Sequence, residues 1–272
     1  MYAPLVLTRT LLTGCALLSL LGGCVSPLPG GLEAHPQGLL PSQDTTTTPK
    51  SHIEVEAVGL WADSEQTTTA AIRYGLTERT EAYLLQDLHR ALSVSNGPDP
   101  SGIGDAWIGL RHRLIDADAD GVAHAFAAEI RIPHADPDQG LGGGELELRL
   151  LHIRDGSWGA NAWTTNTDLR LLGDDGGRPD PALGGSLTVT TPLLRIGERT
   201  YPVGLLTEVG GLWHPEEGTS PGWVAVGLRL PVHPSLEIQI AWMDGLGPDG
   251  PDDRWIVDIG RLLGDALDLR TQ

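Results

Sequence analysis

Strict alternation of apolar and polar side chains is the feature that most constrains the fold of this chain. Between residues 145 and 150 a leucine occupies every second position and a charged residue each position between. The same period of two recurs at 53–57 and 237–240, and no long helical stripe follows residue 52. Alternating side chains point to opposite faces of a β-strand. The chain therefore predicts an all-β domain over residues 52–272.

Turn-forming residues divide this domain into about twelve predicted strands. Most are about 9–11 residues long, which is enough to cross a bilayer when the strand is tilted. The predicted strands lie near residues 52–62, 67–76, 79–89, 103–114, 121–132, 144–154, 158–170, 183–194, 199–212, 221–231, 234–243 and 253–262.

The predicted connections alternate in length. After the first, around Ser64, short ones at 77–78, 116–120, 155–157, 195–198 and near 233 alternate with longer ones rich in Gly, Pro and Asp. An outer-membrane barrel has short periplasmic turns and longer outer loops. A soluble sandwich has no reason to alternate so regularly. The pattern favours an antiparallel up-and-down β-barrel.

The first 23 residues predict a signal peptide. They carry one charge, Arg9, and an apolar run at 11–21 that is too short to span a bilayer as a mature helix. The run ends in a sequence that resembles the lipobox of bacterial lipoproteins, an aliphatic residue and two small residues before a cysteine: Leu21, Gly22, Gly23 and Cys24. The resemblance implies acylation of Cys24, including palmitate. The alternative is an ordinary signal peptide followed by a chance cysteine.

Residues 24–51 predict a flexible tether between the lipidated cysteine and the barrel. This segment shows no periodicity and contains the run Thr45–Thr48 together with Pro27, Pro29, Pro36, Pro41 and Pro49.

Composition excludes several classes of protein. With 36 acidic and 18 basic residues, the net charge of −18 disfavours a nucleic-acid partner, because binding phosphates requires clustered Lys and Arg. Two cysteines cannot form a disulfide framework. A hydrophobic content of 40% is too low for a helical membrane bundle but does not exclude a membrane barrel, in which only alternate residues face lipid.

Charges within the predicted strands are expected to face the barrel lumen. On the lipid face at mid-depth a charge costs about 2–4 kcal/mol. The alternative is a soluble barrel that carries these charges on its outer face. The candidate lumen charges are Arg73, Glu81, Arg111, Arg113, Glu129, Arg131, Glu145, Glu147 and Arg149.

Tryptophans near predicted strand ends suggest interfacial aromatic girdles, with packing in a soluble core as the alternative. They are Trp61, Trp107, Trp158, Trp213, Trp223, Trp242 and Trp255.

Three local motifs resemble a known family when taken together in their order. They are the hairpin sequence at 71–81, the Gly-Ile-Gly-Asp strand at 102–114, and the segment 129–133 followed by glycines at 142–144. They are similar to the outer-membrane transporter-like family associated with meta-pathway phenol degradation, over roughly residues 70–262. The resemblance implies a barrel of about twelve strands and passage of small, often apolar, compounds. His134 and Ala135 depart from the usual Thr-Gly, and His112 from an aromatic residue.

Signals for catalysis or metal binding are weak. Asp116, Asp118 and Asp120 imitate the start of an EF-hand loop, but Ala127 occupies the twelfth position and strands flank the loop. A polar hairpin turn is favoured there over a calcium site. No zinc motif, nucleophile elbow, phosphate loop or dinucleotide fingerprint is present. We therefore expect no cofactor and no enzymatic activity.

The sequence thus predicts a lipoprotein of the bacterial outer membrane whose barrel is a pore or transporter for a small-molecule solute. The alternative is a lipid-anchored soluble barrel or sandwich that binds a ligand or partner in the periplasm.

Overall fold

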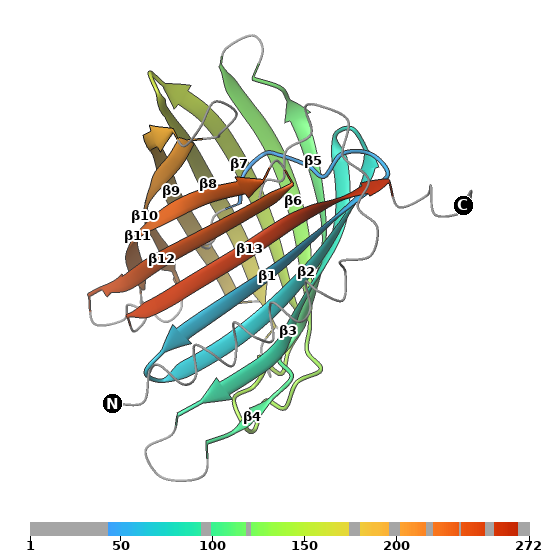
Figure 1. Cartoon of the computed structure of the whole chain (residues 1–272). Coiled ribbons are helices and arrows are strands. Elements are labelled where there is room, and N and C mark those ends of the chain that lie inside the picture. Colours follow the sequence, from blue (N-terminus) through green and yellow to red (C-terminus); the bar gives the residue numbers. More distant parts are fainter. Residues whose placement is uncertain are drawn as a thin grey trace.

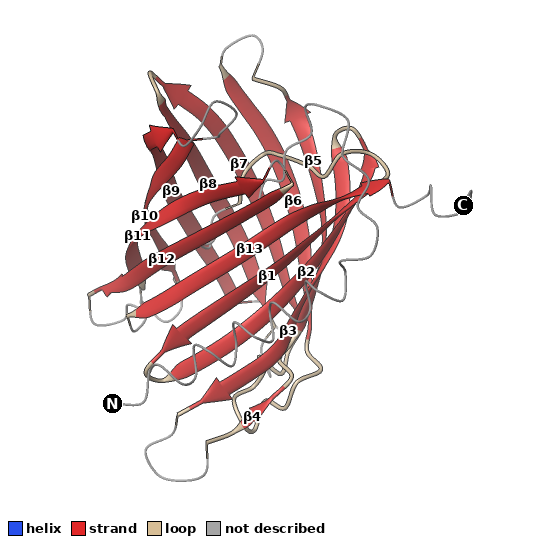
Figure 2. Ribbon diagram, viewed as in Figure 1, coloured by secondary structure: helices blue, strands red, loops and turns tan. Residues whose placement is uncertain are grey.

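One antiparallel sheet makes up the fold. The computed structural model describes residues 43–93, 99–117, 121–173, 180–195, 202–215, 220–233, 235–247 and 253–265. No helix in this described part is long and apolar enough to cross a membrane. The strands, shown in Figures 1 and 2, are β1 (His52–Ala62), β2 (Glu65–Thr77), β3 (Thr80–Leu92), β4 (Ser101–Gly102), β5 (Ala106–Ile115), β6 (Val122–Ile132), β7 (Glu147–Trp158), β8 (Asn161–Leu172), β9 (Asp180–Arg195), β10 (Pro202–Trp213), β11 (Gly222–His233), β12 (Leu236–Leu246) and β13 (Arg254–Asp265).

The sheet closes on itself to form a barrel (Figure 1). Each long strand pairs with its neighbours in the sequence, β4 adds a short pairing to the edge of β3, and β1 pairs with β13 at the seam. The predicted all-β, up-and-down barrel is confirmed. The predicted strands also agree with the twelve long strands, apart from shifts of a few residues at their ends.

The connections alternate in length as predicted. The chain turns within a few residues between β2 and β3, β7 and β8, and β11 and β12, whereas long stretches separate β3 from β5 and β6 from β7. One boundary was wrong: Glu145, expected within a strand, precedes β7. The reason is Gly144, whose φ of 71° breaks the extended conformation just before it.

The two faces of the barrel wall differ in chemistry. Large apolar side chains such as Ile72, Leu146 and Leu150 are exposed on the outside, by 52%, 58% and 42%. Charged side chains such as Glu81 and Arg111 are fully buried on the inside. A soluble barrel would place its apolar face inward, so this inverted distribution matches a barrel surrounded by lipid.

Candidate functional site: the barrel lumen

Ion pairs between neighbouring strands cover much of the inner wall. Arg73 on β2 pairs with Glu56 on β1, and Arg111 on β5 pairs with Glu81 on β3. All four side chains are nearly or completely removed from solvent. A buried charge is tolerated only when it is paired and hydrogen-bonded. These pairs therefore hold opposite charges at fixed positions on the lumen wall.

A second network continues from β3 to β8. The Tyr83 hydroxyl donates a hydrogen bond of 2.7 Å to Glu129, which also pairs with Arg149 at 3.3 Å. Arg149 pairs in turn with Asp168 at 3.0 Å, and Arg170 reaches the same carboxylate at 2.7 Å. Each carboxylate is shared by more than one donor, which restrains the side chains from several directions.

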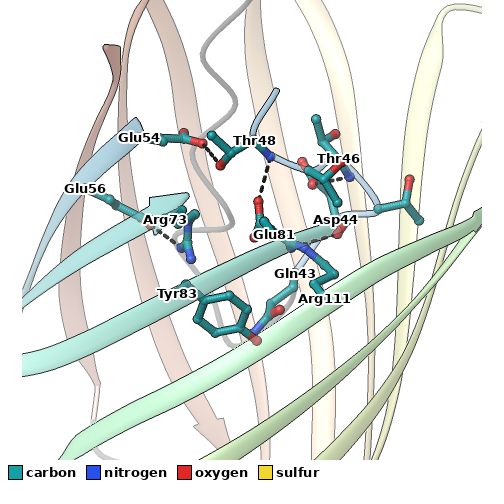
Figure 3. Close-up of polar contacts among 12 residues, drawn as sticks. Gln43, Asp44, Thr46, Thr48, Glu54, Glu56, Arg73, Glu81, Tyr83 and Arg111 are labelled. Carbon is teal, nitrogen blue, oxygen red and sulfur yellow. Dashed lines mark hydrogen bonds and ion pairs between the residues drawn. The ribbon is translucent and has the colours of Figure 1, made fainter. Parts of the chain in front are cut away.

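The chain segment before β1 lies against this wall, inside the barrel (Figure 3). We call residues 43–50 the lumen segment. At its start, the backbone N–H of Gln43 donates to Asn166 on β8, and its side-chain amide donates to Glu129 on β6, at 2.9 and 2.6 Å. Asn166 returns a bond of 2.9 Å to the carbonyl of Gln43. The end of the predicted tether is therefore hydrogen-bonded to inward-facing side chains.

Further bonds cross the lumen to other strands. The N–H groups of Thr45 and Thr48 donate to Asp155 on β7 and Glu81 on β3, both at 2.6 Å. Arg111 on β5 donates to the carbonyl of Asp44 at 3.0 Å. Thr45 and Thr48 are buried. The lumen segment contacts inward-facing side chains of several strands. It must therefore run across the interior of the barrel.

The lumen segment enters beside β2. Lys50 forms a parallel bridge with Gly75, and the N–H of Ser51 donates to the Gly75 carbonyl at 2.8 Å. A Cβ atom at position 75 would overlap the backbone carbonyl of Pro49. Glycine is therefore required at position 75 for this close approach of two backbones.

Asp44 is the acidic residue of the lumen segment. Part of its side chain stays accessible, but the surrounding wall removes most of its water. This burial raises the pKa of the Asp44 carboxyl above its ordinary value, and the positive charges of Arg111 and Arg229 oppose the shift. The docked segment consequently holds a carboxyl group that protonates more readily than in water.

The structure places most of the predicted lumen charges on the inner wall. Five of them belong to the networks described above: Arg73, Glu81, Arg111, Glu129 and Arg149. Two more, Arg131 and Glu147, also lie on the inner wall and pair with each other at 3.1 Å. Arg113 lies at the short-turn end, paired with Asp116 at 3.0 Å. Glu145 lies outside the strands, beside Gly173.

The remaining candidate sites divide into two groups. Asp116 accepts ion pairs from Arg79 and Arg113, and the described ranges hold no group of three or more metal-ligating side chains. Asp118 and Asp120, like the lipobox residues Leu21, Gly22, Gly23 and Cys24, lie outside the described residues.

Two of the tryptophans that were predicted to lie in the outer aromatic girdles face the lumen. Trp223 donates a hydrogen bond of 2.8 Å to Glu208, and the guanidinium of Arg131 lies 5.7 Å from the ring of Trp107. Both lie near strand ends, as predicted, but position along a strand does not determine which face a residue occupies. The neighbouring residues could have shown this: Trp107 shares its parity with Arg111, and Trp223 with Arg229.

Comparison with known proteins identifies the architecture. No family model matches the chain, and no curated protein matches it. Among solved structures, an outer membrane channel from Pseudomonas putida F1 aligns with a TM-score of 0.62 at 14% identity, over 88% of this chain and 100% of that one. The KdgM porin in complex with disordered oligogalacturonate aligns at 0.51 with 7% identity, over 76% and 98%. The NanC porin aligns at 0.50 with 8% identity, over 78% and 98%. At these identities the likeness establishes a shared barrel fold.

Proposed function

We propose that this chain is a lipid-anchored β-barrel of the bacterial outer membrane that passes small solutes through its lumen. The observation that carries the proposal is the inverted wall, apolar outside and charged inside. The channels and porins that share the fold support it. The soluble periplasmic alternative is disfavoured because its exposed leucines and isoleucines would form an apolar surface far larger than a soluble monomer presents.

The lumen segment makes this a restricted pore. It lies across the interior and is held through backbone groups and side chains on both sides of Asp44. A solute therefore passes beside the segment or displaces it. The charges of the wall in strands β1–β8 pair with one another or with the segment, which favours passage over a chemical reaction.

The solute class follows from two considerations. Acidic side chains exceed basic ones in the chain as a whole, which discourages anions. The family resemblance over residues 70–262 supports small compounds, apolar ones included, of the kind met in aromatic degradation. We propose uncharged or weakly polar small molecules as the solutes.

The lipid anchor at Cys24 suits this arrangement. Positions 24 and 43 are 19 residues apart, so the connecting chain reaches at most about 65 Å when extended. This is long enough to connect a lipid at the membrane surface with Gln43, the end of the lumen segment that bonds to Glu129 and Asn166 inside the barrel. Acylation would hold the N-terminus at that membrane surface.

Membrane insertion is tested with Cys24→Ser, which removes the proposed anchor but leaves the barrel intact. We expect this variant to need detergent and to migrate differently in heated and unheated gels. A variant that stays folded in buffer without detergent and shows no such shift would refute the membrane barrel.

Pore function is tested separately by conductance in planar bilayers. We expect small, discrete current steps from the full-length chain. If correctly inserted protein gives no conductance and no solute flux into liposomes, the pore assignment is wrong. Mass spectrometry of the mature N-terminus tests lipidation, and an unmodified Cys24 or cleavage elsewhere would end that part of the proposal.

A further inference from the structure

A cluster of basic and aromatic side chains lies on the outer face of the barrel. We call it the β5–β7 patch; it comprises His112, His124, Phe126, His152 and Arg154. Its members alternate along their strands with buried, inward-facing residues, and Phe126 is 49% exposed. The inward positions next to them include Arg111, Ala125, Ala127, Leu151 and Ile153. The patch therefore faces away from the lumen.

Strand pairing brings the patch together. Phe126 on β6 lies opposite His112 on β5 and His152 on β7, and His124 lies opposite Arg154. The rings of Phe126 and His152 stack at 4.7 Å, and Nδ1 of His124 lies 3.2 Å from Nε2 of His152. Residues directly opposite one another have Cβ atoms only about 5 Å apart. Arg154 thus shares one small surface with the two stacked histidines.

The patch lies toward the short-turn end of the strands. His124 is two residues after the start of β6, and Arg154 is four residues before the end of β7. At that end Trp158 stacks on Trp163 with ring centroids 6.3 Å apart, and Trp158 is exposed. Exposed tryptophans of membrane barrels mark the level of the lipid headgroups. The Arg154 side chain is long enough to reach this level from its strand position.

We propose that the β5–β7 patch binds the phosphate headgroup of an anionic phospholipid in the periplasmic leaflet. The planar guanidinium of Arg154 matches a phosphate with two parallel hydrogen bonds. One N–H of the His124–His152 pair is used in the bond between the two rings, and the other can donate to the phosphate. Phe126 offers an apolar surface to the start of an acyl chain. Charge complementarity selects a lipid over an apolar partner, because a cation on this face is costly unless a headgroup compensates it.

The test is lipid retention by the full-length protein, measured by native mass spectrometry. Protein in detergent is mixed with phosphatidylglycerol or, separately, phosphatidylcholine. We expect preferential retention of phosphatidylglycerol, and about a tenfold weaker retention for Arg154→Gln, as for the loss of one charge-assisted hydrogen-bond pair. Arg154→Lys should fall between the two, since it keeps the charge but loses the paired geometry.

Arg261→Gln is the matched control. Arg261 lies on β13 toward the same end, on the outward parity of Trp255, but its cross-strand neighbours are Val55 and Leu236. We expect it to retain phosphatidylglycerol as the wild type does. Equal losses from Arg154→Gln and Arg261→Gln, equal retention of the two lipids, or full retention by Arg154→Gln would each overturn the proposal. Heat-modified gel migration confirms that every variant is folded, and the outcome does not depend on whether the lumen conducts.

Discussion

The two halves of the lumen wall balance their charges differently. In strands β1–β8 inward arginines face carboxylates in networks that include Arg73, Arg111, Arg131, Arg149 and Arg170. In strands β9–β13 the wall carries the carboxylates of Glu208, Glu237 and Asp258, of which Glu237 pairs with Arg229. An apolar cluster around Met243 completes this half. Asp258 is completely buried, and the carboxylates of Glu56 and Glu237 lie near enough to act on it.

The lumen segment follows this division. The hydrogen bonds of Gln43, Thr45 and Thr48 described above go to strands in the β1–β8 half. A paired wall holds its side chains rigid and can serve as a preformed surface, whereas a wall with excess acid repels a further carboxylate. The comparison indicates that the β1–β8 half holds the segment.

The largest difference between the halves is expected from removing one arginine of each. Arg111→Met leaves Glu81, which is fully buried, without its cation, and should lower the free energy of unfolding by about 3–5 kcal/mol. Arg229→Met removes a side chain that is 31% exposed and leaves buried Glu237 with the Gln239 amide as a donor, so it should cost less, about 1–2 kcal/mol. Urea unfolding in detergent, followed by tryptophan fluorescence, measures both. Equal losses would remove the distinction between the two walls.

A second prediction targets the docking of the lumen segment. Gly75→Ala places a methyl group on the Pro49 carbonyl and should push the segment away from its cradle. Single-channel conductance in planar bilayers should then rise above that of the wild type. Gly185→Ala on β9 is the control, because its added Cβ makes only an ordinary contact of 3.6 Å with the Asn166 carbonyl. A conductance unchanged by Gly75→Ala would show that the segment does not limit passage.

A third prediction compares the loss of one neutral hydrogen-bond donor in each half of the wall. Tyr83→Phe removes a donor to Glu129, and Trp223→Phe removes a donor to Glu208. Each carboxylate keeps another donor, Arg149 and Thr188 respectively. We therefore expect a similar loss of about 1 kcal/mol in both halves, measured as a shift of the unfolding midpoint. A much larger loss in one half would place the asymmetry in hydrogen bonding and not in charge.

The smallest expected effect concerns pH and Asp44. Its pKa is raised in the docked segment, so docking is strongest when the carboxyl is protonated and weakens as pH rises through that raised value. The charges of Arg111 and Arg229 limit the effect, and the carboxyl of Asp155 also interacts with Asp44. Conductance should rise modestly in the wild type as the pH rises through this raised pKa. Asp44→Asn should flatten this rise, and an equal rise in that variant would assign it to another group.

The barrel was predictable because its signals are local. Period-two alternation placed residues such as Leu150 and Glu147 on opposite faces, and turn residues set the alternation of loop lengths. The docking of residues 43–50 was not, because a run of threonines carries no periodicity and its partners, such as Glu81 and Asn166, lie far away in the sequence. Those partners become neighbours only when the sheet has closed.

Closure itself sets an order of assembly. Since the seam joins β1 to β13, the cylinder is complete only when the last strand has been made and paired with the first. Contacts so distant in sequence form late in folding. Residues 43–50 immediately precede β1, so they can lie along the open sheet while the seam is still unpaired. The barrel can thus close around the lumen segment, which need not be threaded into a finished barrel.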